Sequence, residues 1–243
     1  MKEVPGFNRF NELNKSNIRY DYHIHTSQTD GSSTIEEYIN SAIVLGLKEI
    51  AFTEHVRRSS VWFDSFLNEV KSLRLKFQDK LRVFTGMEAK VLDFEGNIDA
   101  SGEMISNSEI VIGSVHRYPN GKNRYLDYLD LSVEDAAEIE FNLACSLLKN
   151  PYVDVLGHPG GVFETQFNMS FPDKFYEDII KKANECDKVI EINCKYLRNP
   201  DNFFKFCKKY NPYVSLGSDA HNMMELGNIF KLINVYLDRS NRN

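Results

Sequence analysis

The sequence predicts an α/β fold in which a mostly parallel sheet closes into a barrel. Short apolar or β-branched segments alternate with amphipathic helical segments about seven times, which is typical of βαβ units with parallel strands. About seven such units within 243 residues suit a barrel related to the (β/α)8 type, and an open doubly wound sheet is the alternative. Because no Pro/Gly/Ser-rich linker interrupts the pattern, we expect residues 1–243 to form a single domain, with residues 1–18 as an N-terminal extension.

The first half of the chain begins this alternation with a strand over residues 20–25. The next helix is expected to open at a capping box of Ser33 and Glu36, to carry apolar residues at helical spacing, and to end at Gly46. Strands are expected to follow over residues 49–53, 82–87 and 110–115, and a long helix over residues 62–77.

The second half continues the alternation with helices over residues 132–149, 174–185, 202–209 and 225–237. Strands are expected between them over residues 153–156, 189–193 and 213–216. No apolar run approaches the roughly 20 residues that span a bilayer, and the N-terminal segment lacks the apolar core of a signal peptide. The sequence therefore predicts a cytoplasmic protein that neither spans nor binds a membrane.

The amino-acid composition and net charge limit the kinds of binding partner that we expect. Hydrophobic residues make up 42% of the chain and charged residues 26%, as in ordinary globular proteins. The net charge of −6 argues against a dedicated duplex-DNA binder, which normally carries a basic face, so we do not expect a nucleic acid partner. A small anionic substrate remains compatible, because a bound metal can reverse the local charge. The four cysteines form no Cys-x-x-Cys pair, and we expect buried free thiols rather than a zinc finger.

All six histidines lie at or just beyond the carboxyl end of a predicted strand. In a parallel barrel these ends share one face, where active sites lie. A single strand-end histidine is more often a packing or hydrogen-bonding residue than a metal ligand, but here no histidine is left for such a role. The histidines are His23, His25, His55, His116, His158 and His221.

Carboxylates follow the same rule, at Asp30, Glu54, Glu88, Glu191 and Asp219. Imidazole and carboxylate ligands together suit zinc, manganese or iron. Residues two apart on a strand point to the same side, so the two histidines of the His-x-His motif can reach one ion. The joint pattern predicts a metal site at the carboxyl ends of the strands.

The motifs resemble those of the polymerase and histidinol phosphatase (PHP) family, and most of all its histidinol-phosphate phosphatase branch. The matching stretches occur in the family's order, at residues 21–26, 30–31, 52–55, 86–88, 113–116, 157–159, 191–193 and 217–221. The resemblance implies a distorted (β/α)7 TIM-like barrel that binds up to three divalent metal ions.

The resemblance also implies a set of ligands for each ion. One ion is expected on His23, His25, Glu88 and Asp219, and Glu88 is expected to bridge to a second ion on His116 and His158. A third ion is expected on His55 and His221. Many relatives supply another histidine at this third site, and the present chain has Asp30 there instead, which is still a competent oxygen ligand.

The function we expect is that of a metal-dependent phosphoesterase. Its substrate is expected to be a small phosphomonoester, with L-histidinol phosphate as one candidate, attacked by a metal-bound hydroxide. Asp219 and Glu54 are candidates for handling protons or orienting water, and both are equally suited to be ligands or to support ligands. A PHP-type nuclease or phosphodiesterase and an amidohydrolase-like carbonyl hydrolase remain alternatives.

Several cations follow the predicted strands and are candidates for binding phosphate. Arg198 comes shortly after the strand at residues 189–193, and its guanidinium matches the geometry of phosphate oxygens. Arg117, Lys122 and Arg124 occupy the loop after the strand at residues 110–115, which is either a substrate lid or a solvated surface loop. Arg57 and Arg58, after the second strand, allow the same two interpretations.

Overall fold

The computed structural model describes residues 4–121 and 124–240. Its strands form an eight-stranded sheet in the order β1-β8-β7-β6-β5-β4-β3-β2. Neighbours from β2 to β8 pair in parallel, whereas β1 pairs antiparallel with β8. The strands are β1 (Asn8–Arg9), β2 (Tyr20–Ile24), β3 (Glu49–Val56), β4 (Arg82–Lys90), β5 (Ile110–Ser114), β6 (Val155–Leu156), β7 (Val189–Asn193) and β8 (Tyr213–Gly217).

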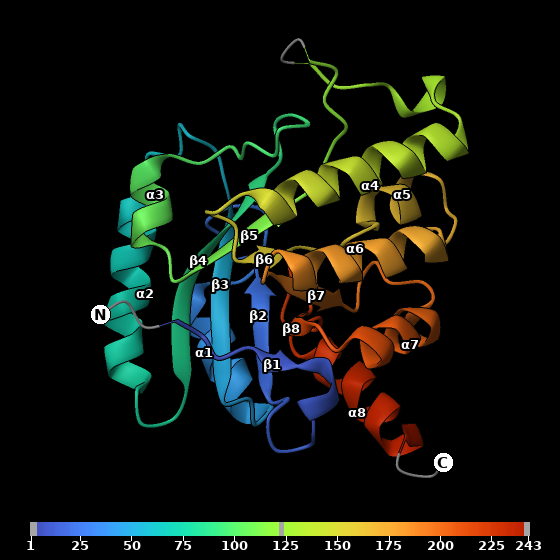
Figure 1. Cartoon of the computed structure of the whole chain (residues 1–243). Helices are drawn as coiled ribbons and strands as arrows, with labels where there is room; N and C mark the ends of the chain where they lie inside the picture. Colours follow the sequence, from blue (N-terminus) through green and yellow to red (C-terminus); the bar gives the residue numbers. More distant parts are fainter. Residues whose placement is uncertain (1–3, 122–123, 241–243) are drawn as a thin grey trace.

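Helices cover the outside of the sheet (Figure 1). In that view α2 and α3 lie at the left, and α4, α6 and α7 pack against one another in succession at the right. The helices are α1 (Ile35–Val44), α2 (Phe63–Phe77), α3 (Gly102–Asn107), α4 (Val133–Lys149), α5 (Gly161–Gln166), α6 (Asp173–Glu185), α7 (Pro200–Tyr210) and α8 (Asn228–Ser240). None of the helices in the described ranges is both long and apolar enough to cross a bilayer.

The barrel has a seam between β2 and β8. The two strands meet through a bridge between Ile24 and Ala220, beside which the amide of His25 donates to the carbonyl of Ala220 at 2.9 Å. At the start of β8 the edge is occupied instead by β1, where Asn8 faces Val214. The barrel is therefore distorted, because β1 takes the edge of β8 that β2 would need for a full ladder.

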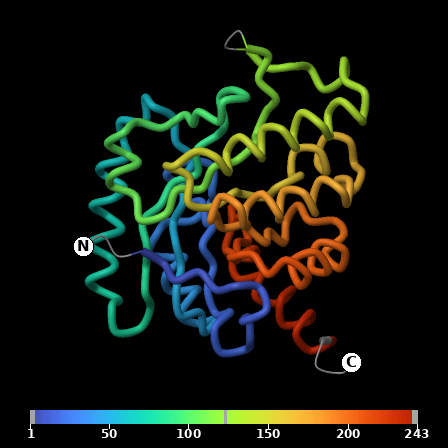
Figure 2. Tube along the Cα trace, viewed as in Figure 1, coloured from blue at the N-terminus to red at the C-terminus, as the bar shows by residue number. Residues whose placement is uncertain are grey.

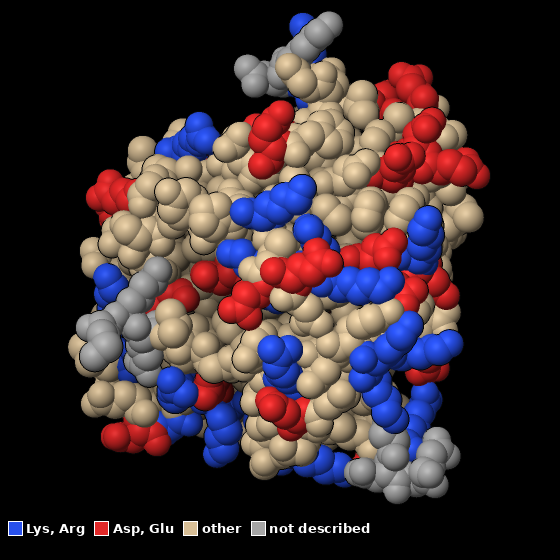
Figure 3. All heavy atoms as spheres, viewed as in Figure 1, with Lys and Arg blue, Asp and Glu red and all other residues tan. Residues whose placement is uncertain are grey.

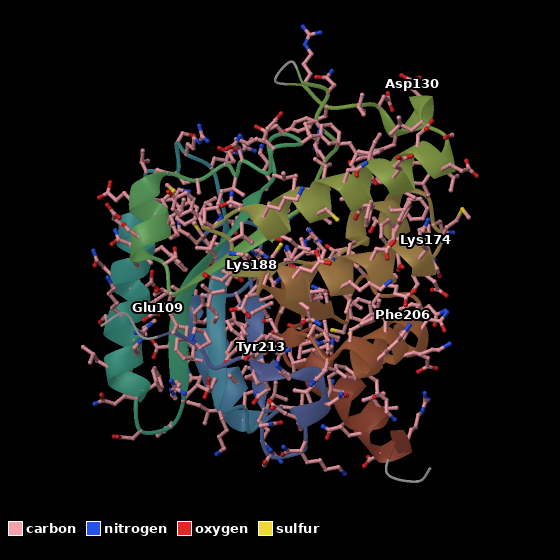
Figure 4. The ribbon with its side chains drawn as sticks, in the orientation of Figure 1. Glu109, Asp130, Lys174, Lys188, Phe206 and Tyr213 are labelled. Carbon is pink, nitrogen blue, oxygen red and sulfur yellow. The ribbon has the colours of Figure 1, made fainter. Side chains whose placement is uncertain are left out.

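The N-terminal segment is consequently part of the barrel wall. Figure 2 shows this blue segment running across to the red C-terminal part of the chain. The guanidinium of Arg9 lies 4.1 Å from the ring centroid of Tyr213, which is labelled in Figure 4 at the start of β8. Phe10 is 3% exposed and packs against Phe204 and Tyr236. Within the described residues, the predicted N-terminal extension thus supplies a strand and a core side chain.

The predicted α/β fold of the distorted TIM-like type, with its parallel strands and intervening helices, is confirmed, although in the described residues no ladder closes the sheet between β2 and β8, which share only an isolated bridge. One local prediction is wrong: the capping box of α1 consists of Thr34 and Glu37, one residue later than Ser33 and Glu36. Both pairs have the spacing of a capping box, so the sequence alone did not distinguish them. In the structure the Thr34 hydroxyl is the one that accepts from the third helical amide, that of Glu37. The short helices α3 and α5 and the strand β1 were not predicted. The cysteines are free thiols, as expected, but only Cys207 is fully buried and the other three are partly buried.

The parallel strands are buried on both faces, as expected for a sheet covered by helices. All residues of β2, β5 and β7 are buried. Ionisable side chains in such strands are costly unless they are paired or bind a metal. His23 of β2 and Glu88 of β4 are such side chains, and both lie near the carboxyl ends of their strands.

Candidate metal centre

The side chains that the sequence predicted as ligands gather at the carboxyl end of the barrel. They come from the last residues of β2, β3 and β4 and from the turns after β2, β5, β6 and β8. Because the strands are parallel, these ends meet at one face. The residues are His23, His25, Asp30, His55, Glu88, His116, His158, Asp219 and His221.

Glu88 lies at the centre of this cluster, and its side chain is 1% exposed. Its Oε1 is 2.9 Å from His116 Nε2 and 2.8 Å from His158 Nε2. Its Oε2 is 2.7 Å from His55 Nδ1. One carboxylate therefore contacts histidines at the ends of three other strands, and both of its oxygens are directed toward the cluster.

A second group of atoms meets around His23 and His25. Their Nε2 atoms lie 3.5 and 3.6 Å from Glu88 Oε2, and 3.7 and 3.1 Å from Asp219 Oδ1. All four of these atoms are buried, and none of them makes a well-aligned hydrogen bond within the described residues, although Glu88 Oε2 has the close contact with His55 Nδ1 given above. Buried polar atoms are normally hydrogen-bonded, so four unpaired atoms that converge fit a divalent cation with nitrogen and oxygen ligands.

Asp30 completes a third group at the outer edge of the cluster. Its Oδ2 lies 3.4 Å from His55 Nε2, and its Oδ1 lies 3.4 Å from His221 Nε2. Together with His25, these side chains place one ligand atom each within 4.8 Å of one another. Asp30 is half exposed, so this group is the one nearest to solvent. The structure thus brings the predicted third set of ligands together.

The electrostatics keep only some of the ligands in the protonation states that a cation requires. At His23, His55 and His158, burial acts to lower the pKa, but the neighbouring carboxylates outweigh it and raise the pKa, so a cation must displace a proton there. Burial lowers the pKa of His25 to about 3, so its imidazole is neutral and has a free lone pair. Burial acts to raise the pKa of Asp219, but His23 and His25 outweigh it and the pKa is lowered. The same competition, with His116 and His23 prevailing, holds the pKa of Glu88 well below its usual range.

Glu191 of β7 supports two of the ligands. Its Oε1 lies 2.7 Å from His23 Nδ1, and its Oε2 accepts from the backbone amide of His158 at 2.6 Å. A proton on His23 Nδ1 leaves Nε2 free to bind an ion. A Cβ at Gly217 would lie 1.9 Å from Glu191 Oε1, so only glycine permits this approach. Glu191 is therefore a residue that orients ligands.

Backbone conformation at two ligands adds a second sign of a functional site. His158 has φ of 23° and Asp219 has φ of 51°, in the left-handed region that residues with a Cβ rarely adopt. Such conformations persist only where the surrounding structure enforces them, and they are common at active sites. Both lie in turns directly after strands, β6 and β8.

The role of Glu191 leads to the first testable prediction. Glu191→Gln should lower metal affinity by about 10- to 100-fold, because the amide cannot hold the imidazole proton on His23 Nδ1 as a carboxylate does. Competition with a chromogenic chelator measures the change. Glu185→Gln at the exposed end of α6 is the control, and it should bind metal as wild type does. Equal affinities of Glu191→Gln and wild type would contradict the orienting role.

Glu54 lies outside the three groups of ligands. Its Oε1 accepts from the amide of Thr26 at 2.8 Å and from its hydroxyl at 2.6 Å, and its Oε2 accepts from the hydroxyl of Thr29. Both oxygens therefore fix the turn between β2 and Asp30. The structure supports a positioning role, and proton transfer by Glu54 stays a prediction without a contact that favours it.

Arg198 likewise makes its contacts within the protein. Its Nε donates to the carbonyl of Glu164 at 3.2 Å, and NH2 donates to the side chain of Asn168 at 2.5 Å. Its amide also donates to the carboxylate of Glu164 at 2.7 Å. These bonds fasten the segment after β7 to α5, and a grip on phosphate would require the guanidinium to exchange them.

Lys195 is a charged neighbour of the cluster that was not predicted. Its Nζ lies 3.1 Å from His221 Nδ1 and 3.4 Å from Asp219 Oδ2. The residue lies in the turn directly after β7, and this position at a strand end was the available signal. Lys195 thus adds a positive charge at the site, on the side of Asp219 that faces away from His25.

A cavity of about 470 Å³ opens beside the cluster and is lined by His55, Glu88 and His116. Its other walls include three cations, Arg57, Lys90 and Arg117. Lys122, predicted as a further cation of this loop, lies outside the described residues. A cavity of this size suits a small molecule.

Comparisons with known proteins agree with this site. A family model described as "PHP domain" matches residues 21–197. The chain belongs to the PHP family. A "Probable phosphatase" of Caldicellulosiruptor saccharolyticus is 30% identical to this PHP protein over 218 residues, covering 84% of this chain and 80% of the relative. A "Probable phosphatase" of Clostridium novyi is 30% identical over 227 residues, covering 87% and 82%.

Among solved structures, the histidinol phosphate phosphatase of Lactococcus lactis, complexed with zinc, L-histidinol and phosphate, has the same fold as this PHP protein. The TM-score is 0.65 at 21% identity, and the match covers 87% of this chain and 92% of the Lactococcus protein. The predicted family is confirmed, and with it the predicted class of metal-dependent phosphoesterase.

Proposed function

We propose that this PHP protein is a phosphomonoesterase that acts on a small phosphorylated substrate. The observation that carries the proposal is the set of buried, unpaired atoms around Glu88. Glu88 also lines the cavity of about 470 Å³, so the ligand cluster faces a space of small-molecule size. The phosphate in the Lactococcus lactis structure supports phosphate ester chemistry on this fold.

The ligand groups favour up to three divalent ions, of zinc, manganese or iron. We assign one ion to His23, His25, Glu88 and Asp219, where the unpaired atoms meet. Glu88, His116 and His158 are assigned to a second ion, and Asp30, His55 and His221 to a third. The Lactococcus lactis structure contains zinc, which supports zinc as one of the metals that these ligands bind.

The bound ions supply the chemistry that such sites share, a lowered pKa of water and neutralisation of phosphate oxygens. The chain's own residues position and charge the site around them. We propose that the Asp219 carboxylate accepts a hydrogen bond from the attacking water and orients it, because His23 and His25 lower its pKa and keep it ionised. The same low pKa makes it a weak base, so orientation is favoured over uptake of the proton. Lys195, 3.4 Å from Asp219 Oδ2, places a positive charge where the phosphate gains negative charge.

Two other classes of enzyme use similar ligands. A nuclease or phosphodiesterase would track its substrate along a basic groove, usually with aromatic side chains for stacking. On the face of the molecule in Figure 3, acidic and basic side chains are interspersed. An amidohydrolase-like carbonyl hydrolase is the second class. The comparison substrates in the experiment below test for both of these activities.

Metal removal tests the proposed function. Protein purified without added metal should contain roughly one ion or more per chain and should hydrolyse p-nitrophenyl phosphate. Activity should disappear in chelator and return with manganese or zinc. Bis-p-nitrophenyl phosphate, single-stranded DNA and p-nitroacetanilide are the comparison substrates. Full activity in chelator without bound metal would refute the metal-dependent mechanism, and faster cleavage of a diester or an amide would assign one of the other classes.

A further inference from the structure

The cavity beside the metal centre has an unusual balance of charge. Three cations line it, Arg57, Lys90 and Arg117, and among its lining residues in the described part of the chain Glu88 is the single acid. Glu88 is itself assigned to the metal ions. The space next to the reacting phosphate is therefore positive before a substrate arrives, in addition to the charge of the ions.

The three cations are placed there by the strands that also carry ligands. Arg57 comes directly after β3, two residues beyond His55. Lys90 is the last residue of β4, two beyond Glu88, so both side chains lie on the same side of that strand. Arg117 follows His116 after β5. Each cation is therefore one or two residues from a ligand and faces the same cavity.

An aromatic ring holds two of the cations together. The Nζ of Lys90 lies 5.5 Å and the guanidinium of Arg117 5.4 Å from the ring centroid of Tyr125, which also lines the cavity. Lys90 has one acidic neighbour, Asp99, at 3.4 Å. Within the described residues, no carboxylate forms an ion pair with Arg57 or Arg117. The guanidinium groups of Arg57 and Arg117 thus remain available for an anion. The ammonium of Lys90 lies over the same Tyr125 ring as Arg117 and adds to the positive charge there.

The charge of the leaving group follows from this arrangement. Ions bound to the ligand groups would neutralise the phosphate that reacts. A leaving group with an ammonium, such as the amino alcohol of L-histidinol phosphate, would meet like charges in the cavity. A leaving group with an anionic end would meet two planar guanidinium forks, which match phosphate and carboxylate oxygens.

We propose that the substrate is a phosphomonoester whose leaving group carries a second anionic group, bound by Arg57, Lys90 and Arg117. The proposal rests on the phosphomonoesterase function proposed above. Water attacks phosphorus and the ester P–O bond breaks. The hydroxyl of that water becomes part of the inorganic phosphate, and its other proton ends on the oxygen of the released alcohol. The second anion, a phosphate or a carboxylate, is bound and not cleaved in that step.

A matched series of three-carbon substrates tests the proposal with the metal-loaded full chain. The series is propyl phosphate, 3-aminopropyl phosphate, 3-phosphonooxypropanoate and propane-1,3-diyl bisphosphate. The carboxylate or the bisphosphate, the latter corrected for its two equivalent ends, should exceed propyl phosphate in kcat/KM by about tenfold or more. 3-Aminopropyl phosphate should be the slowest of the four. The faster of the two anionic substrates identifies the second group.

Arg57→Gln and Arg117→Gln supply the decisive comparison. The measured quantity is kcat/KM for the preferred anionic substrate divided by kcat/KM for propyl phosphate. Each variant should lower this ratio by about tenfold, toward one. The control is Lys80→Gln, an exposed lysine before β4 at the opposite end of the barrel, which should keep the wild-type ratio.

The other outcomes overturn the proposal in distinguishable ways. Equal kcat/KM across the series, or an unchanged ratio in variants that lose activity on every substrate, would show that the cations hold the reacting phosphate instead. Preference for 3-aminopropyl phosphate would reverse the assigned charge. If even p-nitrophenyl phosphate and propyl phosphate are not hydrolysed, the phosphomonoesterase function itself is refuted and this proposal falls with it.

Discussion

Glu88→Gln should reduce kcat/KM for phosphomonoesters by about a thousandfold or more. The reason is that both oxygens of Glu88 face imidazole nitrogens, Oε1 those of His116 and His158 and Oε2 that of His55. An amide keeps the shape but removes the negative charge and one of the two acceptors. Metal content, measured by elemental analysis after purification, should fall by at least about one ion per chain.

The control for this variant is Glu69→Gln, an exposed residue of α2. It removes the same charge at a distance from the ligands and should keep both metal content and activity. Circular dichroism should show the same secondary structure for both variants, because Glu88 contributes ligand contacts rather than core packing. Wild-type metal content in Glu88→Gln would contradict the shared-ligand role.

Much of this centre could be predicted from the sequence because it depends on a simple rule. In parallel strands every carboxyl end lies at one face, so residues such as His55 and His158, which are 103 positions apart, meet once the strands are identified. The strands themselves are recognisable as apolar runs between helices. Position along the chain is therefore enough to assemble the ligands, without knowledge of side-chain contacts.

The roles of individual carboxylates were harder to predict, for reasons that particular residues illustrate. Glu54 and His55 are neighbours on β3, so their side chains point to opposite sides of the strand, and this alternation could have separated Glu54 from the ligands. Glu191 offers no such signal. Its side chain is directed toward the site, and only its bonds to His23 and to the amide of His158 show that it orients ligands.

Elements with few residues escaped prediction because periodicity needs length. The helices α3 and α5 have six residues each, which is less than two turns, and β1 has two. The seam was also beyond prediction from sequence. The antiparallel pairing of Asn8 with Val214 joins segments from the two ends of the chain, and nothing local in either segment specifies the partner.

Substitution of Asp21 in β2, which lies at the seam between β2 and β8, is expected to have the largest effect on stability. This fully buried carboxylate spans the gap between β2 and the segment after β8. Its Oδ1 accepts from the amide of Ser218 at 3.0 Å, and its Oδ2 accepts from the Ser218 hydroxyl at 2.5 Å and the amide of Gly227 at 2.9 Å. Asp21→Ala should lower the free energy of unfolding by about 3–5 kcal/mol, because it leaves buried donors without an acceptor.

Asp21→Asn should cost less, about 1–3 kcal/mol, because the amide retains one acceptor oxygen and places a second donor against the Gly227 amide. Urea unfolding in chelator measures both variants without the contribution of bound metal, and Asp79→Ala, in the exposed turn after α2, is the control. If Asp21→Ala unfolds within about 0.5 kcal/mol of wild type, the backbone bridge at Ile24 and Ala220 is sufficient to hold the seam. Because Ser218 immediately precedes the ligand Asp219, the destabilised seam should also weaken metal binding, which a loss of core packing elsewhere would not do.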